Sequence, residues 1–334
     1  MKLVRRLLLR LVIALLVTWG VASAAWFMTV WLPGDPVETV LGPQASPADI
    51  ERARALYGSD RPASERYLNY HRRLVHGPNA ELAHDHCAEL PLGLHANLGF
   101  SFVYNQPVAA LIKKKLPLSF DLAVVAIALQ VVLSVGLGVL SALKRGSRID
   151  ELIVGASTAL SAAPTFASGL FLQYFLAHRL GLLPIDGAGK APGMFSLSIL
   201  LPALTLALYG TGVLTRLVRS ELQEAIDKPF VRVARARGAS RLYAFGFHAL
   251  RTTLGPITQL TILELGALIS GAIVTEKLFR WPGLGDLTVN AIQSRDPELV
   301  MGITLASALL VTVSTLLADL VAVLLDPRPR NHTR

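Results

Sequence analysis

The chain has 334 residues, of which 52% are hydrophobic and only 16% are charged, and its mean hydropathy is +0.50. This composition is typical of a polytopic membrane protein and argues against a soluble enzyme. The net charge of +9 does not indicate nucleic-acid binding, because the basic residues are distributed by membrane side, and the single cysteine, Cys87, excludes an internal disulfide.

The first apolar segment runs from Leu11 to Leu32 and follows four basic residues. A cleaved secretory signal is the competing interpretation, because Ala22-Ser23-Ala24 could serve as the cleavage site. The apolar run continues through Trp31, which makes it long enough to span a bilayer with tryptophans at interfacial depth. We therefore expect residues 1–32 to form a tail and an uncleaved first transmembrane helix.

Residues 33–117 form a long, more polar segment, which we expect on the outer side of the membrane. A turn is predicted at Pro33-Gly34-Asp35-Pro36, and a short helix from Pro47 to Tyr57. The segment also holds a group of potential metal ligands: His84, His86, Cys87 and His95. Their spacing matches no strong zinc signature, so we prefer surface residues over a metal site and expect no metal.

Five further apolar segments follow, each near or above the roughly 20 residues that a helix needs to cross the hydrocarbon. They are Leu118–Leu143, Leu152–Ala177, Ser196–Leu217, Leu254–Thr275 and Leu299–Leu325. We therefore predict an all-α polytopic membrane protein with six transmembrane helices, five of them in a core over residues 118–334. Pro164 interrupts the second of these five segments and predicts a kinked helix.

The distribution of Lys and Arg predicts the orientation of these helices. The two termini and the loops at 144–148 and 216–251 together carry 18 basic residues, whereas the short loops on the opposite side carry 5. Both termini are therefore expected in the cytoplasm. The remaining basic residues lie in the long outer segment, which the rule largely ignores because long segments are translocated regardless of charge.

Polar residues within the spans are few, and lipid makes them costly enough that we expect them to face protein or a water-filled path. They are Asp121, Gln130, Gln173, Gln259, Glu264 and Asp319. Asp121 and Asp319 lie near helix ends, where capping or interfacial solvation explains them. Glu264 lies deeper, and the sequence leaves open whether it lines a cavity or pairs with another helix.

A charged island from Glu221 to Arg251 is too polar to lie in lipid. Within it, Pro229 predicts the start of a short helix and Gly238 its end. This helix could pack under its own transmembrane helices, insert into a groove on another protein, or belong to a solvated loop. Helical spacing gives it one broad apolar face, made of Phe230, Val231, Val233 and Ala234.

Two stretches carry a resemblance to a known family. The first is Ala234-Arg-Ala-Arg-Gly238-Ala-Ser followed by His248-Ala-Leu250-Arg251, and the second is Thr275-Glu-Lys-Leu-Phe-Arg-Trp-Pro-Gly-Leu-Gly-Asp286. They resemble the cytoplasmic coupling loop and an outer loop of binding-protein-dependent ABC importer permeases, in the dipeptide and oligopeptide branch. The general coupling motif begins with Glu-Ala-Ala, where this chain has Arg232, Val233 and Ala234, a departure that fits the peptide branch. The similarity covers nearly the whole chain apart from residues 77–97.

The resemblance implies a role for each region. The loop over residues 216–253 would contain coupling helices that dock into an ATPase subunit, through Phe230, Val231, Val233, Ala234, Arg235, Ala236, Gly238, Ala239, Ser240 and His248. The implied residues of the translocation path and outer gate are Ser161, Pro164, Gln173, Glu264, Glu276, Trp281, Pro282, Gly283 and Gly285. Trp281 and Phe279 are expected at the membrane interface, and Leu284–Ser294 is expected to be a short amphipathic helix.

The resemblance also implies a function, that of a permease subunit in the bacterial plasma (inner) membrane. It would form half of the pore of an ATP-driven importer for di- or oligopeptides. The implied partners are a second permease subunit, expected to be a different chain that completes a heterodimer, two ABC ATPase subunits and an extracytoplasmic substrate-binding protein. The chain has no Gly-x-x-x-x-Gly-Lys-Ser/Thr loop, so ATP and Mg²⁺ are expected in the ATPases, and no cofactor, catalytic residue or enzymatic activity is expected in this chain.

Two alternatives remain open. A nickel or other metal-chelate importer of the same superfamily would share these motifs. An ATPase-independent channel or secondary transporter would instead predict internal repeats, and the sequence contains no clear duplication.

Overall fold

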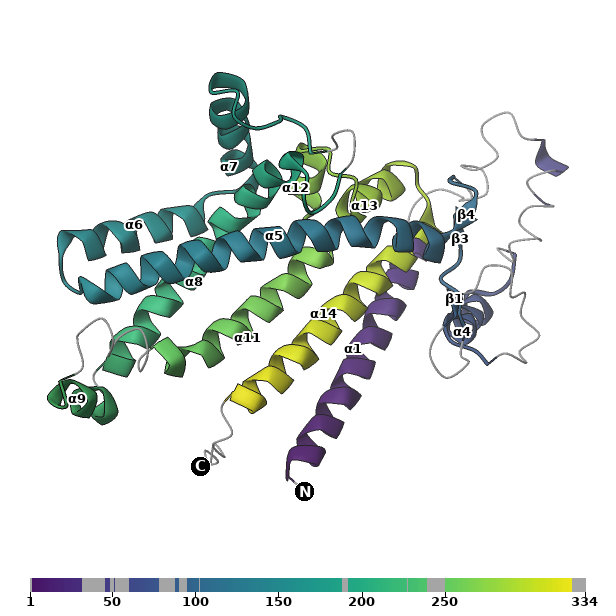
Figure 1. Ribbon diagram of the computed structural model, residues 1–334. Helices are drawn as coiled ribbons and strands as arrows, with labels where there is room; N and C mark the ends of the chain where they lie inside the picture. Colours follow the sequence, from purple (N-terminus) through teal and green to yellow (C-terminus); the bar gives the residue numbers. More distant parts are fainter. Residues whose placement is uncertain are drawn as a thin grey trace. The chain divides into compact units, whose positions relative to one another are not determined.

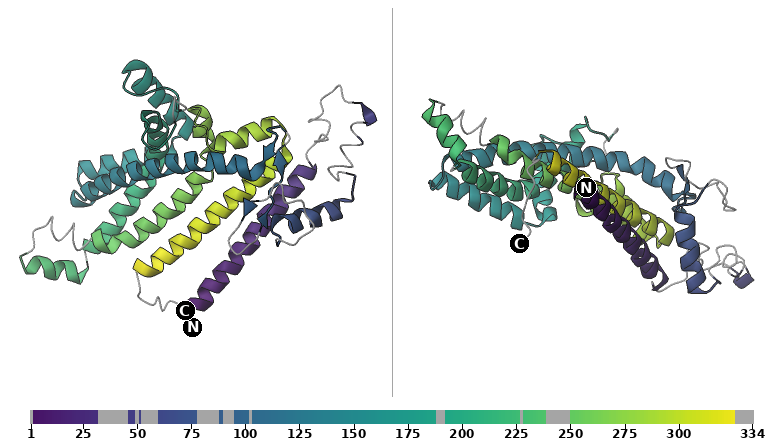
Figure 2. Two further views of the ribbon diagram at one scale, coloured as in Figure 1. Left: turned by 45° about the vertical axis from the view of Figure 1, so that its right-hand side comes forward. Right: turned by 90° about the horizontal axis from the view of Figure 1, so that it is seen from below.

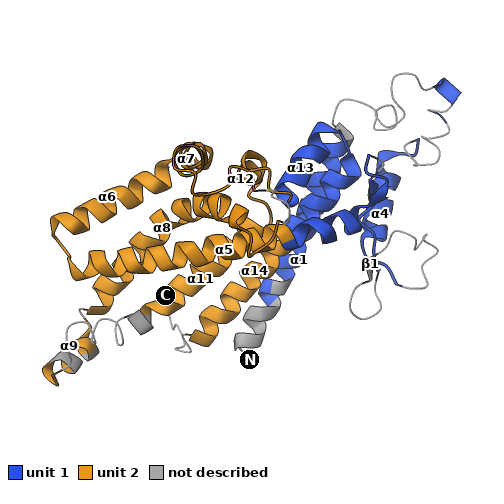
Figure 3. Cartoon of the chain, turned by 45° about the horizontal axis from the view of Figure 1, so that its top comes forward, with its two compact units in different colours: residues 1–117, 283–309 blue, residues 118–282, 310–334 orange. Residues whose placement is uncertain are grey.

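The computed structural model of the chain describes residues 2–31, 46–48, 51, 60–77, 88–89, 95–101, 103–187, 192–226, 228–238 and 250–325 (Figure 1). The chain divides into two compact units, Met1–Pro117 with Gly283–Leu309 and Leu118–Pro282 with Leu310–Arg334 (Figure 3). The described residues are mainly helical, which confirms the predicted fold class. Two long helices, α5 (Val108–Leu143) and α14 (Pro297–Leu325), contribute residues to both units.

The first unit combines α1 (Lys2–Trp31), α4 (Ala63–Leu74) and α13 (Leu284–Gln293) with four short strands. β1 (Ala88–Glu89) pairs antiparallel with β2 (His95–Ala96), and β3 (Phe100–Ser101) pairs antiparallel with β4 (Gln106–Pro107). Its core brings together Trp26 of α1, Tyr70 of α4 and Met301 of α14. Burial of these large side chains fixes α4 to two helices that are far apart in sequence.

The second unit is organised around α8 (Leu200–Ile226), which follows a 3₁₀ turn at Leu197–Ile199. The helices that contact α8 include α5, α6 (Arg148–Ala162), α7 (Thr165–Leu172), α9 (Pro229–Ala236), α11 (Leu250–Ile269) and α12 (Ile273–Leu278). Leu201, Leu214 and Leu222 of α8 are fully buried. Small residues on α8 let its neighbours approach closely, as is usual for helices packed in membranes.

Within the described residues, four helical stretches are long and apolar enough to cross a membrane: α1, α5, Leu197–Ile226 and α14. α6 and the helix from Thr165 to Arg179 make a fifth span if this bent pair crosses as one, and α11 supplies only a shorter apolar stretch, Thr253–Ile269. The polytopic architecture is therefore confirmed, whereas the count of six spans stays a prediction.

Two of the expected spans are divided for local backbone reasons. Ala163 is extended (ψ 131°), since the residue before a proline avoids the helical region, and Pro164 is the N-cap residue that precedes α7. The result is a bend of 105°, much sharper than an ordinary proline kink. Gly271, with φ of +135°, separates α11 from α12 within the expected span Leu254–Thr275.

Part of the predicted outer segment lies outside the described residues, including the turn at 33–36 and His84, His86 and Cys87. In the predicted helix over 47–57, residues 47, 48 and 51 are helical. His95 lies in β2, and its ring is 5.9 Å from that of His76, between centroids. No group of three His, Cys, Asp or Glu side chains suited to a metal occurs among the residues that the structure describes.

Candidate functional site

α9 is the short helix predicted within the charged island. It begins at Pro229 and ends at Ala236, and Gly238 just beyond it has φ of +91°. Both predicted boundaries are therefore confirmed, because a residue in this left-handed conformation ends a helix and favours glycine. In both Figure 1 and Figure 2, α9 lies beside the ends of α8 and α11, at one end of the second unit.

The apolar residues of α9 are divided between two environments. Val231 is 2% exposed and packs in a cluster with Leu222 of α8, Ile257 of α11 and Ala142 of α5. Val233 is 50% exposed. The single broad apolar face predicted from the sequence is therefore wrong, because residues two apart on a helix point to opposite sides.

The other predicted coupling residues are less fully described. Ala236 and Gly238 are exposed. The structure describes the helical backbone of Phe230, Ala234 and Arg235 but not their side chains. Ala239, Ser240 and His248 lie outside the described residues.

Close to α9, a buried ion pair joins the first turn of α6 to α8. The Asp150 carboxylate accepts hydrogen bonds from Arg219 Nε (2.7 Å) and from a second guanidinium nitrogen of Arg219 (2.8 Å). It also accepts from the Ser141 hydroxyl and from the Gly146 backbone N–H at 3.0 Å. Ser147 caps the start of α6 by accepting from the Asp150 N–H. One carboxylate on α6 thus accepts four hydrogen bonds from three residues, which lie on α5, in the turn after it and on α8.

Further along, α6 and α8 are in direct contact at Ser161 and Gly212. A Cβ added at Gly212 would lie 2.3 Å from Ser161 Oγ and 2.4 Å from the Ser157 carbonyl oxygen. Arg216 of α8 donates hydrogen bonds to that carbonyl (3.0 Å) and to the Ser161 hydroxyl (3.2 Å). Ser161 therefore lies at a packed helix crossing, whereas Pro164 is exposed.

The deeper carboxylate, Glu264, lies where α11 approaches α5. Its side chain is partly buried and accepts a hydrogen bond from the Gln130 amide. This contact shows that Glu264 is hydrogen-bonded to another helix, and its position on a cavity or path stays a prediction. Gln173 lies elsewhere, at the start of the π-helical segment after α7, where its amide nitrogen is 3.4 Å from the Ile185 carbonyl oxygen.

The outer segment around α12 is tightly packed in the second unit. Glu276 is fully buried, and its carboxylate accepts a hydrogen bond from the Ser119 hydroxyl at 2.7 Å. Trp281 is also fully buried and its indole N–H donates to the Leu118 carbonyl oxygen at 2.9 Å. Phe279 has no exposed surface. Both rings are thus buried within protein and do not face lipid, and their position at the depth of the membrane interface stays a prediction.

Pro282 ends this segment of the second unit, and Gly283 and Gly285 begin the part of the first unit that contains α13. α13 confirms the predicted short helix. It buries Leu284, Leu287 and Ala291 at helical spacing and leaves Ile292 59% exposed.

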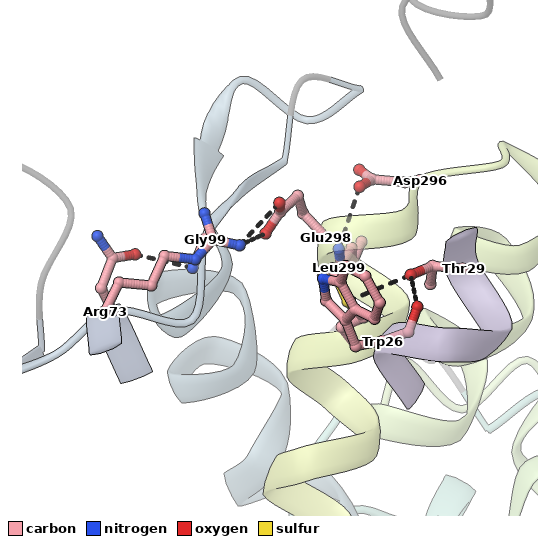
Figure 4. A network of polar contacts seen from close by, with 9 residues as sticks. Trp26, Thr29, Arg73, Gly99, Asp296, Glu298 and Leu299 are labelled. Atoms are coloured by element: carbon pink, nitrogen blue, oxygen red, sulfur yellow. Dashed lines mark hydrogen bonds and ion pairs between the residues drawn. The ribbon is translucent and has the colours of Figure 1, made fainter. Parts of the chain in front are cut away.

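The first unit holds an ion pair that the sequence gave no reason to expect. A guanidinium nitrogen of Arg73, on α4, donates to Glu298 Oε1 at 2.8 Å and to Oε2 at 2.6 Å (Figure 4). Gly99 makes room for it, because a Cβ there would lie 2.1 Å from Glu298 Oε2. Asp296 caps the start of α14 by accepting from the Leu299 N–H at 3.1 Å. An aspartate before a proline is a common start of a helix and could have indicated this cap, whereas nothing in the sequence indicates the distant Arg73.

Tyr70 lies beside this ion pair, with its ring 5.6 Å from the Arg73 guanidinium carbon. Burial raises the pKa of Tyr70 from 10.0 to about 12; the negative charge of Glu298 adds to this shift, and the positive charge of Arg73 opposes it. Its hydroxyl is buried and has no hydrogen-bond partner in the described part of the chain. A hydroxyl in this position costs free energy rather than supplying it.

Replacing Tyr70 with phenylalanine is therefore expected to leave stability unchanged or raise it by up to about 1 kcal/mol. The wild type should lose stability as the pH rises from 10 towards 12, since the unfolded phenol ionises first, and the variant should lose less over that range. Thermal unfolding of both proteins in detergent between pH 9 and 11 measures the difference. A large loss of stability in Tyr70→Phe would show that the hydroxyl has a partner.

Comparison with known proteins identifies the family. The family described as "Binding-protein-dependent transport system inner membrane component" matches residues 134–331, and the family described as its N-terminal region matches residues 2–123. The chain belongs to this family of transport components. The family membership and the apolar helices together establish a multi-pass membrane protein with a role in transport.

Several curated relatives of this family match almost the full length of the chain. A dipeptide transport system permease, DppB of Lactococcus lactis, is 30% identical over 98% of this chain and 99% of its own. An oligopeptide transport system permease, AppB of Bacillus subtilis, is 32% identical over 97% and 98%. A putative peptide transport system permease of Brucella abortus is 31% identical over 93% and 94%.

The family matches cover the parts of the chain just described. α9, Glu264 and the segment around Trp281 all lie within residues 134–331, and the Arg73 region lies within the N-terminal match. The resemblance drawn from sequence motifs is therefore confirmed at the level of the family. The role of each predicted site residue stays a prediction.

Proposed function

We propose that the chain forms one half of the pore of an ATP-driven importer of di- or oligopeptides in the bacterial plasma membrane, with both termini in the cytoplasm. Relatives that match nearly the whole chain are named as dipeptide and oligopeptide permeases, which supports a peptide substrate. A second, different permease subunit would complete the pore. Two ATPase subunits would bind ATP and Mg²⁺, and an outer binding protein would deliver the peptide.

The observation that carries this proposal is the attachment of α9. Val231 is buried in one cluster with residues of α5, α8 and α11, while Val233 on the opposite side is half exposed. A helix that shares a buried cluster with residues of three membrane helices can transmit to them a displacement applied to its other side. Packed cores move as rigid bodies rather than deforming continuously, so the attached helices would move together.

In this mechanism, closure of the ATPase subunits pushes on the exposed side of α9. The displacement passes through Val231 to Leu222 of α8 and Ile257 of α11, and the pore changes from one access state to the other. Asp150 and Arg219 keep α6 attached to α8 during this movement. The helices of this chain would thus transmit the movement, and the partner subunits would supply the energy from ATP.

Gly238 offers a direct test of the proposed transmission of movement through α9. Among the described residues, a Cβ at Gly238 would meet nothing within 4 Å, so Gly238→Asp adds a charge at the end of α9 without a clash with that part of the chain. We expect at least a ten-fold loss of ATP-dependent peptide uptake by the reconstituted transporter, with normal membrane insertion. The reason is that the carboxylate would occupy the surface that receives the ATPase.

Gly181 provides the matched control. It also has positive φ (+62° against +91°) and open space around it, so Gly181→Asp carries a similar backbone strain of roughly 1 kcal/mol. Because Gly181 follows the π-helical segment on the expected outer side, uptake should be retained. Equal uptake by the two variants would contradict the proposed coupling through α9. Inhibition of uptake by nickel rather than by competing peptides would contradict the proposed peptide substrate.

A further inference from the structure

A carboxylate lies deep in the second unit, where α5, α8 and α11 meet. Glu264 of α11 accepts a hydrogen bond from the amide of Gln130 on α5. Gln130 is about 20 Å of helix from the end of α5 at Leu143. Placing an ionisable group at this depth in an apolar span costs free energy, so such a group usually has a functional role or a polar partner.

Gln130 is held in one position by its surroundings. Its side chain is 1% exposed. A Cβ added at Gly210 of α8 would lie 2.1 Å from Gln130 Oε1 and 2.6 Å from Nε2. Only glycine at this position leaves room for the amide, so α8 fixes the direction in which Gln130 donates its hydrogen bond to Glu264.

Glu264 differs from Gln130 in being only partly buried. Among the described residues its carboxylate has the Gln130 amide as hydrogen-bond donor and forms no ion pair. A carboxylate has about four acceptor positions, and one neutral amide leaves most of them for another donor. The chain thus presents a partly accessible carboxylate that is oriented but not neutralised.

We propose that Glu264 binds the terminal ammonium group of a peptide as it passes through the pore, with Gln130 as its positioning residue. This inference rests on the proposed function of peptide import. An ammonium group carries one positive charge and three N–H donors, which match the free acceptor positions of the carboxylate. A single carboxylate supplies selectivity and still allows release, since a site used in conduction must not hold its cargo too firmly.

Uptake of one dipeptide and of its N-acetyl form tests this proposal in the complete reconstituted transporter, at a concentration at which the wild type transports both. Glu264→Gln keeps the shape and removes the charge. We expect uptake of the free dipeptide to fall about ten-fold and uptake of the acetylated form to change less than two-fold. The binding protein is the same in every assay, so its own preference cancels when variants are compared.

Two further variants separate recognition from structure. Gln130→Leu should lower the preference for the free dipeptide in the same direction as Glu264→Gln, because the carboxylate loses its orientation. Glu224→Gln, which removes an exposed carboxylate that pairs with Lys228, should leave the preference unchanged. An equal loss for both peptides in Glu264→Gln, or no loss for either, would overturn the proposal.

A cysteine at position 264 tests whether the position lines the path. Cys87 is the only cysteine in the chain, so a Cys87→Ala background gives a single reactive site. A cationic methanethiosulfonate reagent should modify Glu264→Cys during turnover, and free dipeptide should slow this reaction. Absence of modification from either side would also overturn the proposal. If the wild type imports neither peptide but another solute, the proposed function itself fails, and this result is distinct from a failure at Glu264.

Discussion

Replacing Gly212 with alanine is expected to separate α6 from α8 and to cost about 3 kcal/mol of stability. The added Cβ would lie 2.4 Å from the Ser157 carbonyl oxygen and 3.0 Å from the Ser161 backbone nitrogen. Backbone atoms cannot rotate out of the way, so the two helices must move apart. The hydrogen bond from Arg216 to the Ser157 carbonyl, now 3.0 Å, would lengthen with them.

Gly155 is the matched control because it lies on α6 and a Cβ there meets nothing within 4 Å. Gly155→Ala should be neutral or stabilising by up to about 1 kcal/mol, through the higher helix propensity of alanine. Thermal unfolding of the purified variants in the same detergent compares them directly. Similar melting temperatures for the two variants would show that α6 and α8 are not packed as closely as the structure indicates.

The helices could be predicted because each depends on neighbouring residues. Pro229 and Gly238 delimit α9, and the apolar runs that end at Leu143 and Leu325 match the ends of α5 and α14. Pro164 predicted a break but not its angle. The direction of α7 after the break depends on distant contacts, such as the close approach of Gly169 to Leu278, and no local pattern encodes these.

Contacts between polar residues could not be predicted, because the sequence shows which polar side chains are present but not the distances between them in the fold. Glu264 was recognised as unusual, whereas its partner Gln130 lies 134 positions away. Trp281 was assigned to the membrane interface because indole rings suit that environment. An indole ring is equally well placed in a buried site that satisfies its N–H, and the Leu118 carbonyl oxygen provides one.

Replacing Asp150 with alanine is expected to cost about 4 kcal/mol, the largest loss among the variants considered, because it leaves one partner of a buried ion pair uncompensated. The Asp150 side chain is 4% exposed and that of Arg219 is 28% exposed. The Ser141 hydroxyl and the Gly146 N–H would lose their acceptor as well. Glu151→Ala, at the exposed neighbouring position, should change the melting temperature little.

The double variant Asp150→Leu with Arg219→Met distinguishes stability from coupling. Apolar residues of similar size can replace a buried ion pair with little or no loss of stability, so we expect the melting temperature to recover. Uptake should stay low if the ion pair transmits movement, because Arg219 lies one turn before Leu222, which belongs to the same buried cluster as Val231 of α9. Recovery of both stability and uptake would show that α6 only needs to be attached to α8, and that the charges of Asp150 and Arg219 have no separate part in coupling.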